Sequence, residues 1–135
     1  MVERLVVTTG RQGLFEFTDQ IQALVKHSGL EQGLCTLCIQ HTSASLIIQE
    51  NADPSARVDL ENWLNRLVPE HDPLYTHTME GADDMPAHIK SMLTASSLSI
   101  PVIDQQLALG VWQGVYCWEH RHSSKQRTII VHLGP

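Results

Sequence analysis

The hydrophobic residues of this chain follow two patterns, and the first predicts β-strands near both ends of the sequence. Short runs rich in β-branched and aromatic residues, bounded by turn-forming residues, are typical of strands. Such runs occupy residues 5–8, 34–40, 45–49, 98–102, 107–109, 111–119 and 127–133. The sequence therefore predicts strands in its first 50 and its last 40 residues.

The second pattern is an apolar spacing of three or four residues, which predicts helices in between. Asp53-Pro54 is a clear start signal, because a capping carboxylate precedes a proline at the first helical position. The pattern predicts helices over residues 18–27 and 54–67 and from residue 84 onward. Together the patterns predict an α+β protein: one domain over residues 1–135, built of a mostly antiparallel sheet or sandwich with about three helices.

Composition narrows the possible classes of protein. Nine Lys and Arg stand against fifteen Asp and Glu, for a net charge of −6, and the basic residues are scattered. Nucleic-acid binders usually carry a basic patch, so we expect no nucleic-acid partner. No apolar run approaches the roughly 20 residues that a membrane-spanning helix needs, and residues 1–5 do not resemble a signal peptide. We therefore expect a cytoplasmic protein without a membrane partner.

The three cysteines include the pair Cys35-Thr36-Leu37-Cys38, whose spacing is that of some redox and zinc motifs. The pair falls on a predicted strand, where residues three apart point to opposite faces about 10 Å apart. A disulfide needs Cα atoms within about 7 Å, and no second such pair completes a zinc site. We interpret these cysteines as reduced thiols of the core.

Two polar segments lie between residues 40 and 53. In an extended segment, His41, Ser43 and Ser45 share one face, where they could bind a metal or phosphate oxygens, or simply face water at a strand edge. In the second segment, Asp53 is explained as a helix cap, whereas Asn51 is free to reach a site.

A third polar segment, residues 77–90, is the richest in candidate chemistry. It combines two histidines, three acids beside Gly81 and a lysine. Two imidazoles and a carboxylate are common ligands of a divalent metal. Acids beside a helix start can also cap it, and we expect one of Asp83 and Asp84 to do only that.

A fourth segment, residues 110–121, mixes aromatic and polar positions. Strand alternation places Gln113, Glu119 and Arg121 on one face, and Trp112, Tyr116, Trp118 and His120 on the other. Glu119 and Arg121 could form an ordinary ion pair. Alternatively, Arg121 could hold a phosphate in a bidentate manner.

Taken together, these segments resemble the YjbQ-like family. The matching stretches, in family order, are His41–Leu46, Glu50–Pro54, Glu80–Lys90, Trp112–Gly114 and Glu119–Arg121. Two departures are visible: Val111 stands where the family usually has Thr, and residues 124–127 read Ser-Lys-Gln-Arg where the family tends to have Gly-Gly-Ser-Arg.

The resemblance implies a compact α+β fold that forms a homotrimer with sites near the subunit interfaces. It also implies a weak thiamine-phosphate synthase activity, in which a pyrimidine methyl diphosphate joins a thiazole phosphate and pyrophosphate is released. Fold alone does not determine function.

These observations lead to one leading hypothesis, an enzyme that acts on a phosphorylated small molecule. His41, His77 and His88 bind a divalent metal, expected to be zinc, and His120 is a further candidate. Asp83 or Glu119 orients an imidazole, and Gln113 orients substrate or water. The expected phosphate-binding residues are Ser43, Asn51, Lys90 and Arg121. The alternatives are a non-catalytic binding module for a phosphorylated metabolite and a metal-dependent phosphate-ester hydrolase.

Overall fold

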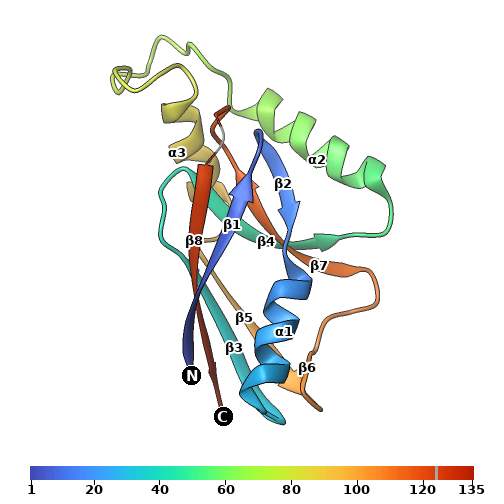
Figure 1. The fold of residues 1–135 in the computed structure, drawn as a ribbon. Coiled ribbons are helices and arrows are strands. Elements are labelled where there is room, and N and C mark those ends of the chain that lie inside the picture. The colour runs from blue at the N-terminus through green and yellow to red at the C-terminus, as the bar shows by residue number, and fades with distance from the viewer. Residues whose placement is uncertain (124) are drawn as a thin grey trace.

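The computed structural model describes residues 1–123 and 125–135 (Figure 1). In these residues, eight strands form two antiparallel sheets, and three helices pack around them. Their order is β1 (Val2–Thr9), β2 (Gly13–Glu16), α1 (Thr18–Ser28), β3 (Gln32–Ile39), β4 (Ala44–Glu50), α2 (Pro54–Leu67), α3 (Asp84–Leu93), β5 (Ser97–Ile103), β6 (Gln106–Leu107), β7 (Gln113–Glu119) and β8 (Lys125–Gly134). The α+β class predicted from the sequence is confirmed. Ser124, in the predicted turn, lies outside the described residues.

The two sheets differ in size. One has five strands in the order β1-β8-β3-β5-β6, and the other has three in the order β2-β7-β4. Figure 1 shows α1 continuing from the lower end of β2 alongside the lower half of the larger sheet, with α2 and α3 at the opposite, upper end. The helices therefore cover different ends of the sheets, and α2 and α3 lie close to the point where β7 ends.

Strand β7 separates two apolar cores because its side chains alternate. Val115 and Cys117 belong to the main core between the sheets and α1. Tyr116 and Trp118 point to the other face, where they pack with Leu64 of α2 in a second cluster. The alternation predicted for residues 110–121 is thus confirmed for residues 113–119, which are the residues that form the strand. Each face of β7 is buried, which explains why this strand reads as nearly continuous hydrophobic sequence.

Helix α2 begins as its sequence predicts. The Asp53 carboxylate accepts a hydrogen bond from the Ser55 N–H at 2.9 Å, and Pro54 occupies the first helical position. The cap prediction is wrong for α3, because the side chain of Asp83 makes no capping hydrogen bond and Asp84 is buried in the first turn. Both carboxylates instead form ion pairs with Arg121.

Two smaller predictions need correction. Strand β2 was not predicted, because it is only four residues long and its sequence, Gly-Leu-Phe-Glu, is too short to show a period. The three cysteines are free, and Cys35 and Cys117 are buried as expected, but Cys38 is exposed. Cys38 lies three residues from Cys35 on β3 and therefore faces the opposite side of the sheet.

Candidate functional site

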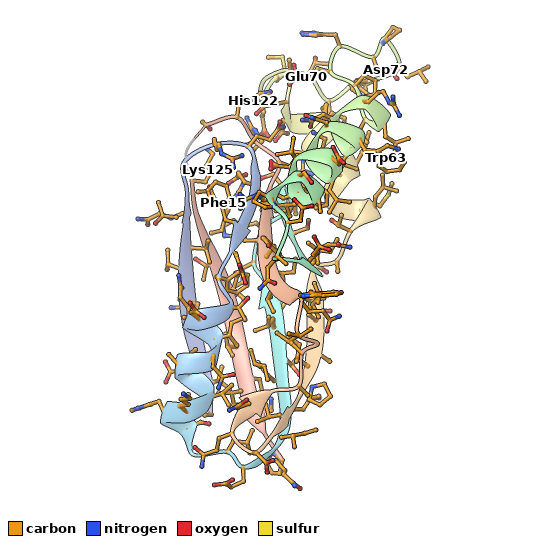
Figure 2. The ribbon with its side chains drawn as sticks, turned by 90° about the vertical axis from the view of Figure 1, so that its right-hand side faces the viewer. Phe15, Trp63, Glu70, Asp72, His122 and Lys125 are labelled. Atoms are coloured by element: carbon orange, nitrogen blue, oxygen red, sulfur yellow. The ribbon has the colours of Figure 1, made fainter. Side chains whose placement is uncertain are left out.

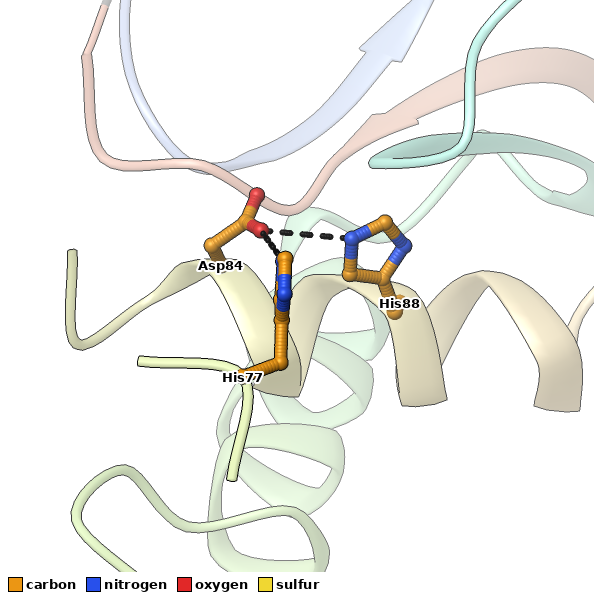
Figure 3. A group of neighbouring side chains, drawn as sticks. All are labelled: His77, Asp84 and His88. Atoms are coloured by element: carbon orange, nitrogen blue, oxygen red, sulfur yellow. Dashed lines mark hydrogen bonds and ion pairs between the residues drawn. The ribbon is translucent and has the colours of Figure 1, made fainter. Parts of the chain in front are cut away.

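The first turn of α3 brings together the side chains with the clearest potential for chemistry. Asp84 and His88 are four residues apart, so both project from one face of this helix. His77 reaches the same point from the loop between α2 and α3. Figure 3 shows both imidazole rings directed at the Asp84 carboxylate. We call these three residues the His77 cluster.

Short distances connect the three residues of the His77 cluster. Asp84 Oδ2 lies 2.8 Å from Nε2 of His77 and 3.2 Å from Nε2 of His88. The two rings meet edge to face with centroids 5.3 Å apart. One potential ligand atom from each residue lies within 4.8 Å of the other two. This is a set of two imidazoles and one carboxylate with metal-binding spacing.

Arg121 holds the one acid of the His77 cluster, Asp84, and the neighbouring Asp83 in place. Its Nη1 donates to Asp84 Oδ1 at 2.6 Å and its Nε donates to Asp83 Oδ2 at 3.0 Å, while its Nη2 donates to the Glu80 carbonyl at 2.8 Å. Oδ1 of Asp84 thus binds the guanidinium, and Oδ2 faces the two histidines. Burial alone would raise the pKa of Asp84, but the His77 hydrogen bond and the Arg121 charge outweigh it and lower this pKa.

A cavity of about 430 Å³ borders the His77 cluster. Its wall comes from the loop between α2 and α3 and the start of α3, and it is lined by His71, Asp72, Pro73, Tyr75, His77, Thr78, Gly81, Ala82 and Met85. Gly81 has φ of 107°, a conformation that favours glycine, at the turn leading into α3. We call this space the His77 cavity, and a ligand held in it would touch the cluster through His77.

His41, expected as a third metal ligand, lies outside the His77 cluster. Its Nε2 accepts a hydrogen bond from the Thr128 N–H at 2.8 Å, so this nitrogen carries no proton and is already occupied. Burial, followed by the charge of Arg127, lowers the pKa of His41. Asp84 takes the third position in the cluster.

Glu119, expected to be catalytic, lies between the two sheets with no exposed surface. Its Oε1 accepts from the Thr9 hydroxyl at 2.6 Å and from Arg127 Nε at 2.8 Å, while its Oε2 accepts the Arg121 N–H at 3.1 Å. Burial alone would raise the pKa of Glu119, but the bonds from Arg127 and Thr9 lower it. Of the two alternatives for Arg121, the ion pair with Glu119 is not formed, because Arg127 is the ion-pair partner of Glu119.

Three other candidates bind groups away from the cluster. Ser43 Oγ accepts from Arg127 Nη2 at 2.9 Å. Gln113 Oε1 accepts the Gly110 N–H at 2.7 Å, and Asn51 Nδ2 donates to Glu16 Oε2 at 3.0 Å.

The register of β7 explains why Gln113 and Asn51 lie far from the His77 cluster of the same subunit. Gln113 pairs with Glu50, next to Asn51, at the first residue of this strand, and Glu119 is its last residue. Six residues of strand span about 20 Å. The groups that contact Arg121 lie at the Glu119 end, so the candidate residues fall into separate places.

Lys90 lies on α3 but does not join the His77 cluster. It is buried, and its Nζ donates to Asn65 Oδ1 at 2.5 Å. Burial lowers its pKa, although the charges of Glu70 and Asp83 oppose this shift. His120, the further metal candidate, is buried against Ser45, with 2.8 Å between Nε2 and Oγ.

Sequence reasoning missed Asp84 as a possible ligand and Arg127 as the partner of Glu119. The signal for Asp84 was present, since Asp84 and His88 have the four-residue spacing that places side chains on one helix face. Arg127 matches the last residue of the family's Gly-Gly-Ser-Arg turn, but its pairing with Glu119 could not be predicted, because it depends on β8 lying near the end of β7.

Comparison with known proteins consistently indicates one protein family. The model of the family described as "UPF0047 protein YjbQ-like" matches residues 3–134. A UPF0047 protein of Synechocystis is 53% identical over 97% of this chain and 89% of its own length. The UPF0047 protein YjbQ of Salmonella typhimurium is 45% identical over 87% of this chain and 83% of its own length.

A solved structure agrees with these sequence matches. The crystal structure of a conserved hypothetical protein from Thermus thermophilus is similar with a TM-score of 0.87 and 36% identity, covering 98% of this chain and 99% of that one. Among the described residues, no helix has both the length and the apolar character needed to cross a membrane.

Proposed function

This chain belongs to the YjbQ-like family, UPF0047, and we propose that it is a metal-dependent enzyme that acts on a phosphorylated small molecule. The observation that carries the proposal is the His77 cluster, with its three ligand atoms within 4.8 Å of one another at the border of the His77 cavity. Its metal ligands are His77, Asp84 and His88.

The donor set suits zinc. Tetrahedral ligands at zinc distances of about 2.0–2.2 Å lie roughly 3.3 Å from one another. The two Nε2-to-Oδ2 distances of 2.8 and 3.2 Å are close to this spacing. Three protein ligands leave a fourth position for water or substrate, as in catalytic zinc sites. A bound zinc would supply Lewis-acid chemistry, by polarising a phosphoryl oxygen or lowering the pKa of a water.

The remaining residues have roles that follow from their contacts. Arg121 fixes the Asp84 carboxylate through Oδ1 and leaves Oδ2 for the metal. Gly81 and Ala82 line the cavity just before α3, so the positive end of this ten-residue helix faces a bound ligand. The Thr78 hydroxyl and the His71 ring are hydrogen-bond donors on the same wall. This combination favours a phosphate group.

The first experiment measures metal content. Protein purified without added metal is expected to hold about one zinc per chain, and His88→Ala and Asp84→Asn to lose it. His27→Ala, which removes an exposed histidine of α1, is the matched control and should keep its zinc. Full metal content in His88→Ala would exclude this ligand set.

A second experiment distinguishes the possible activities. The zinc-loaded protein is assayed for phosphate release from p-nitrophenyl phosphate and for formation of thiamine phosphate from its two precursors. Turnover that is lost on chelation and in His88→Ala, and is restored by zinc, supports an enzyme. Calorimetric binding of thiamine phosphate without any turnover would instead support a non-catalytic binding module.

The homotrimer stays a prediction that can be tested separately. Several large apolar side chains on α2 and α3 are exposed in the single chain, as expected for surfaces between subunits: Val58, Trp63, Leu67, Met92 and Leu93. Light scattering should give a mass three times the 15.1 kDa of one chain. A mass of one chain would contradict the trimer.

A further inference from the structure

A second cavity, of about 380 Å³, lies where α2 ends, between α2, α3 and the residues that follow β7. It is lined by Gln12, Asn65, Val68, Glu70, Lys90 and His122. Figure 2 shows Glu70 and His122 close together at this end of the molecule. We call this space the Lys90 cavity.

The Lys90 cavity is separate from the His77 cluster because the two use different faces of α3. His88 and Lys90 are two residues apart, which is a rotation of about 200° around a helix. His88 faces Asp84 and His77, whereas Lys90 faces Asn65 of α2. The cavities of about 430 and 380 Å³ share no lining residue. A ligand in the Lys90 cavity therefore does not need the metal.

The Lys90 ammonium has little compensation for its burial. The residue is 4% exposed, and the one hydrogen bond from its Nζ goes to the neutral amide of Asn65. Within residues 1–123 and 125–135, no carboxylate oxygen lies within the 4.0 Å of an ion pair with this ammonium. Buried charges are normally paired, since burying an unpaired one is costly.

The two nearby acids already have partners. Glu70 Oε1 lies 2.6 Å from His122 Nε2. Asp83 Oδ2 accepts from Arg121 Nε at 3.0 Å and from the His122 N–H at 2.8 Å. These contacts leave the Lys90 ammonium as a positive charge on a cavity wall, with two N–H donors beyond the one used by Asn65.

We propose that the Lys90 cavity binds the oxyanion group, a phosphate or a carboxylate, of a small molecule independently of the metal site. Lys90 supplies the charge and two donors. The Asn65 amide, which accepts from Lys90 through its oxygen, can donate through its nitrogen. Gln12 Nε2 donates to the His120 carbonyl at 3.0 Å and has a second hydrogen to donate. An ammonium and two amides are a suitable donor set for an oxyanion.

The test uses metal-free protein, so that phosphate cannot bind through zinc. Thermal unfolding is followed with increasing inorganic phosphate or malonate, and sodium chloride at matched ionic strength serves as reference. A saturating rise in Tm with either anion is expected, on the order of 5 °C at ten times the Kd. Phosphate and malonate distinguish a phosphate site from a carboxylate site.

Two variants assign the effect to Lys90. Lys90→Met removes the charge at similar length and should abolish the saturating rise, whereas Lys26→Met, at an exposed lysine of α1, should keep it. Asn65→Asp places a carboxylate beside the ammonium, so it should also abolish the response while the fold is kept. This second variant decides the matter if Lys90→Met does not fold.

The outcomes are separable from those of the zinc experiments. His88→Ala should retain the full response to phosphate, because His88 lies on the other face of α3. Equal responses in the wild type, Lys90→Met and Asn65→Asp would overturn the proposal, and so would no saturating response to either anion. In that case Lys90 only ties α3 to α2 through Asn65.

Discussion

Two clusters of charged residues lie close together in this protein, and they differ in the groups that surround their carboxylates. In the first, Glu119 and Arg127 are buried between the sheets, and both carboxylate oxygens accept hydrogen bonds from protein groups. In the second, Asp84 Oδ2 lies between two imidazole rings, and one of these rings, that of His77, lines the His77 cavity. We call the first cluster closed and the second open, because the second borders a cavity through His77.

The two clusters are joined by Arg121, whose N–H contacts Glu119 and whose guanidinium contacts Asp84. The closed cluster therefore fixes the chain at the point from which Arg121 reaches the open one. A charged residue in a polar motif can thus serve the fold or the site. The deciding feature is the partner: Glu119 binds arginine, hydroxyl and backbone donors, whereas Asp84 Oδ2 faces two imidazoles that can themselves bind a metal. Variants should separate the two clusters, with stability depending on one and metal binding on the other.

The largest expected effect is on stability, from Glu119→Gln. This change leaves the Arg127 guanidinium buried without its carboxylate, and breaking a buried pair costs about 3–5 kcal/mol. Urea unfolding of the metal-free protein measures this loss, with Glu3→Gln, at an exposed carboxylate near the start of β1, as control. A loss below about 1 kcal/mol would show that the closed cluster does not stabilise the fold.

The pH dependence of stability should come next in size. Burial, together with the charges of Lys90 and Arg127, lowers the pKa of His120 to about 3. The unfolded chain protonates this histidine near pH 6.5, so below that pH the unfolded state binds more protons. Stability is therefore complete above pH 6.5 and falls as the pH drops toward 3. The expected loss is about 3 kcal/mol between pH 6.5 and 4.5, at roughly 1.4 kcal/mol per unit.

Urea unfolding at several pH values tests this dependence, with a His120→Gln variant for comparison. The variant should lose most of the slope above about pH 5, where few carboxylates are protonated. An unchanged slope would mean that His120 is not the group responsible.

Asp84→Asn should affect zinc affinity more than stability, which is the opposite of Glu119→Gln. Zinc affinity, measured by competition with a chromophoric chelator, should fall at least 100-fold, or about 2.7 kcal/mol. Stability without metal should fall by less than half as much as in Glu119→Gln, because Asp83 still pairs with Arg121. Equal losses of stability in the two variants would remove the distinction between closed and open clusters.

The smallest effect is expected from Arg121→Met. Without the guanidinium, the Asp84 carboxylate keeps its ligand atom but loses its fixed orientation, and such losses lower metal affinity by about 10-fold or more. Arg11→Met, which removes an exposed arginine paired with Glu61, should leave zinc affinity unchanged. If both variants bind zinc as tightly as the wild type, Arg121 has no part in positioning Asp84.

The fold was largely predictable, because hydrophobic period and capping chemistry are local. Helix α2 follows from Asp53-Pro54 and its apolar spacing, and the two faces of β7 follow from alternation. Strand β2 was missed, since its four residues become a strand only by pairing with β7. Local sequence carries no such information.

The site was predictable in part. His77 and His88 were identified from composition, and the four-residue spacing of Asp84 and His88 could have added the carboxylate. His41 could not be excluded from sequence, because its Nε2 is occupied by Thr128, a residue 87 positions away. The role of Glu119 likewise depends on Arg127, which the sheet topology brings to it. Contacts between distant segments decide which polar residues are free.

The most direct test of the central claim is a crystal structure of the zinc-loaded protein with anomalous diffraction measured on either side of the zinc edge. The account predicts one strong peak about 2.0–2.2 Å from Nε2 of His77, Nε2 of His88 and a carboxylate oxygen of Asp84. A peak at Glu70 and His122, or anywhere else without these three ligands, would contradict it.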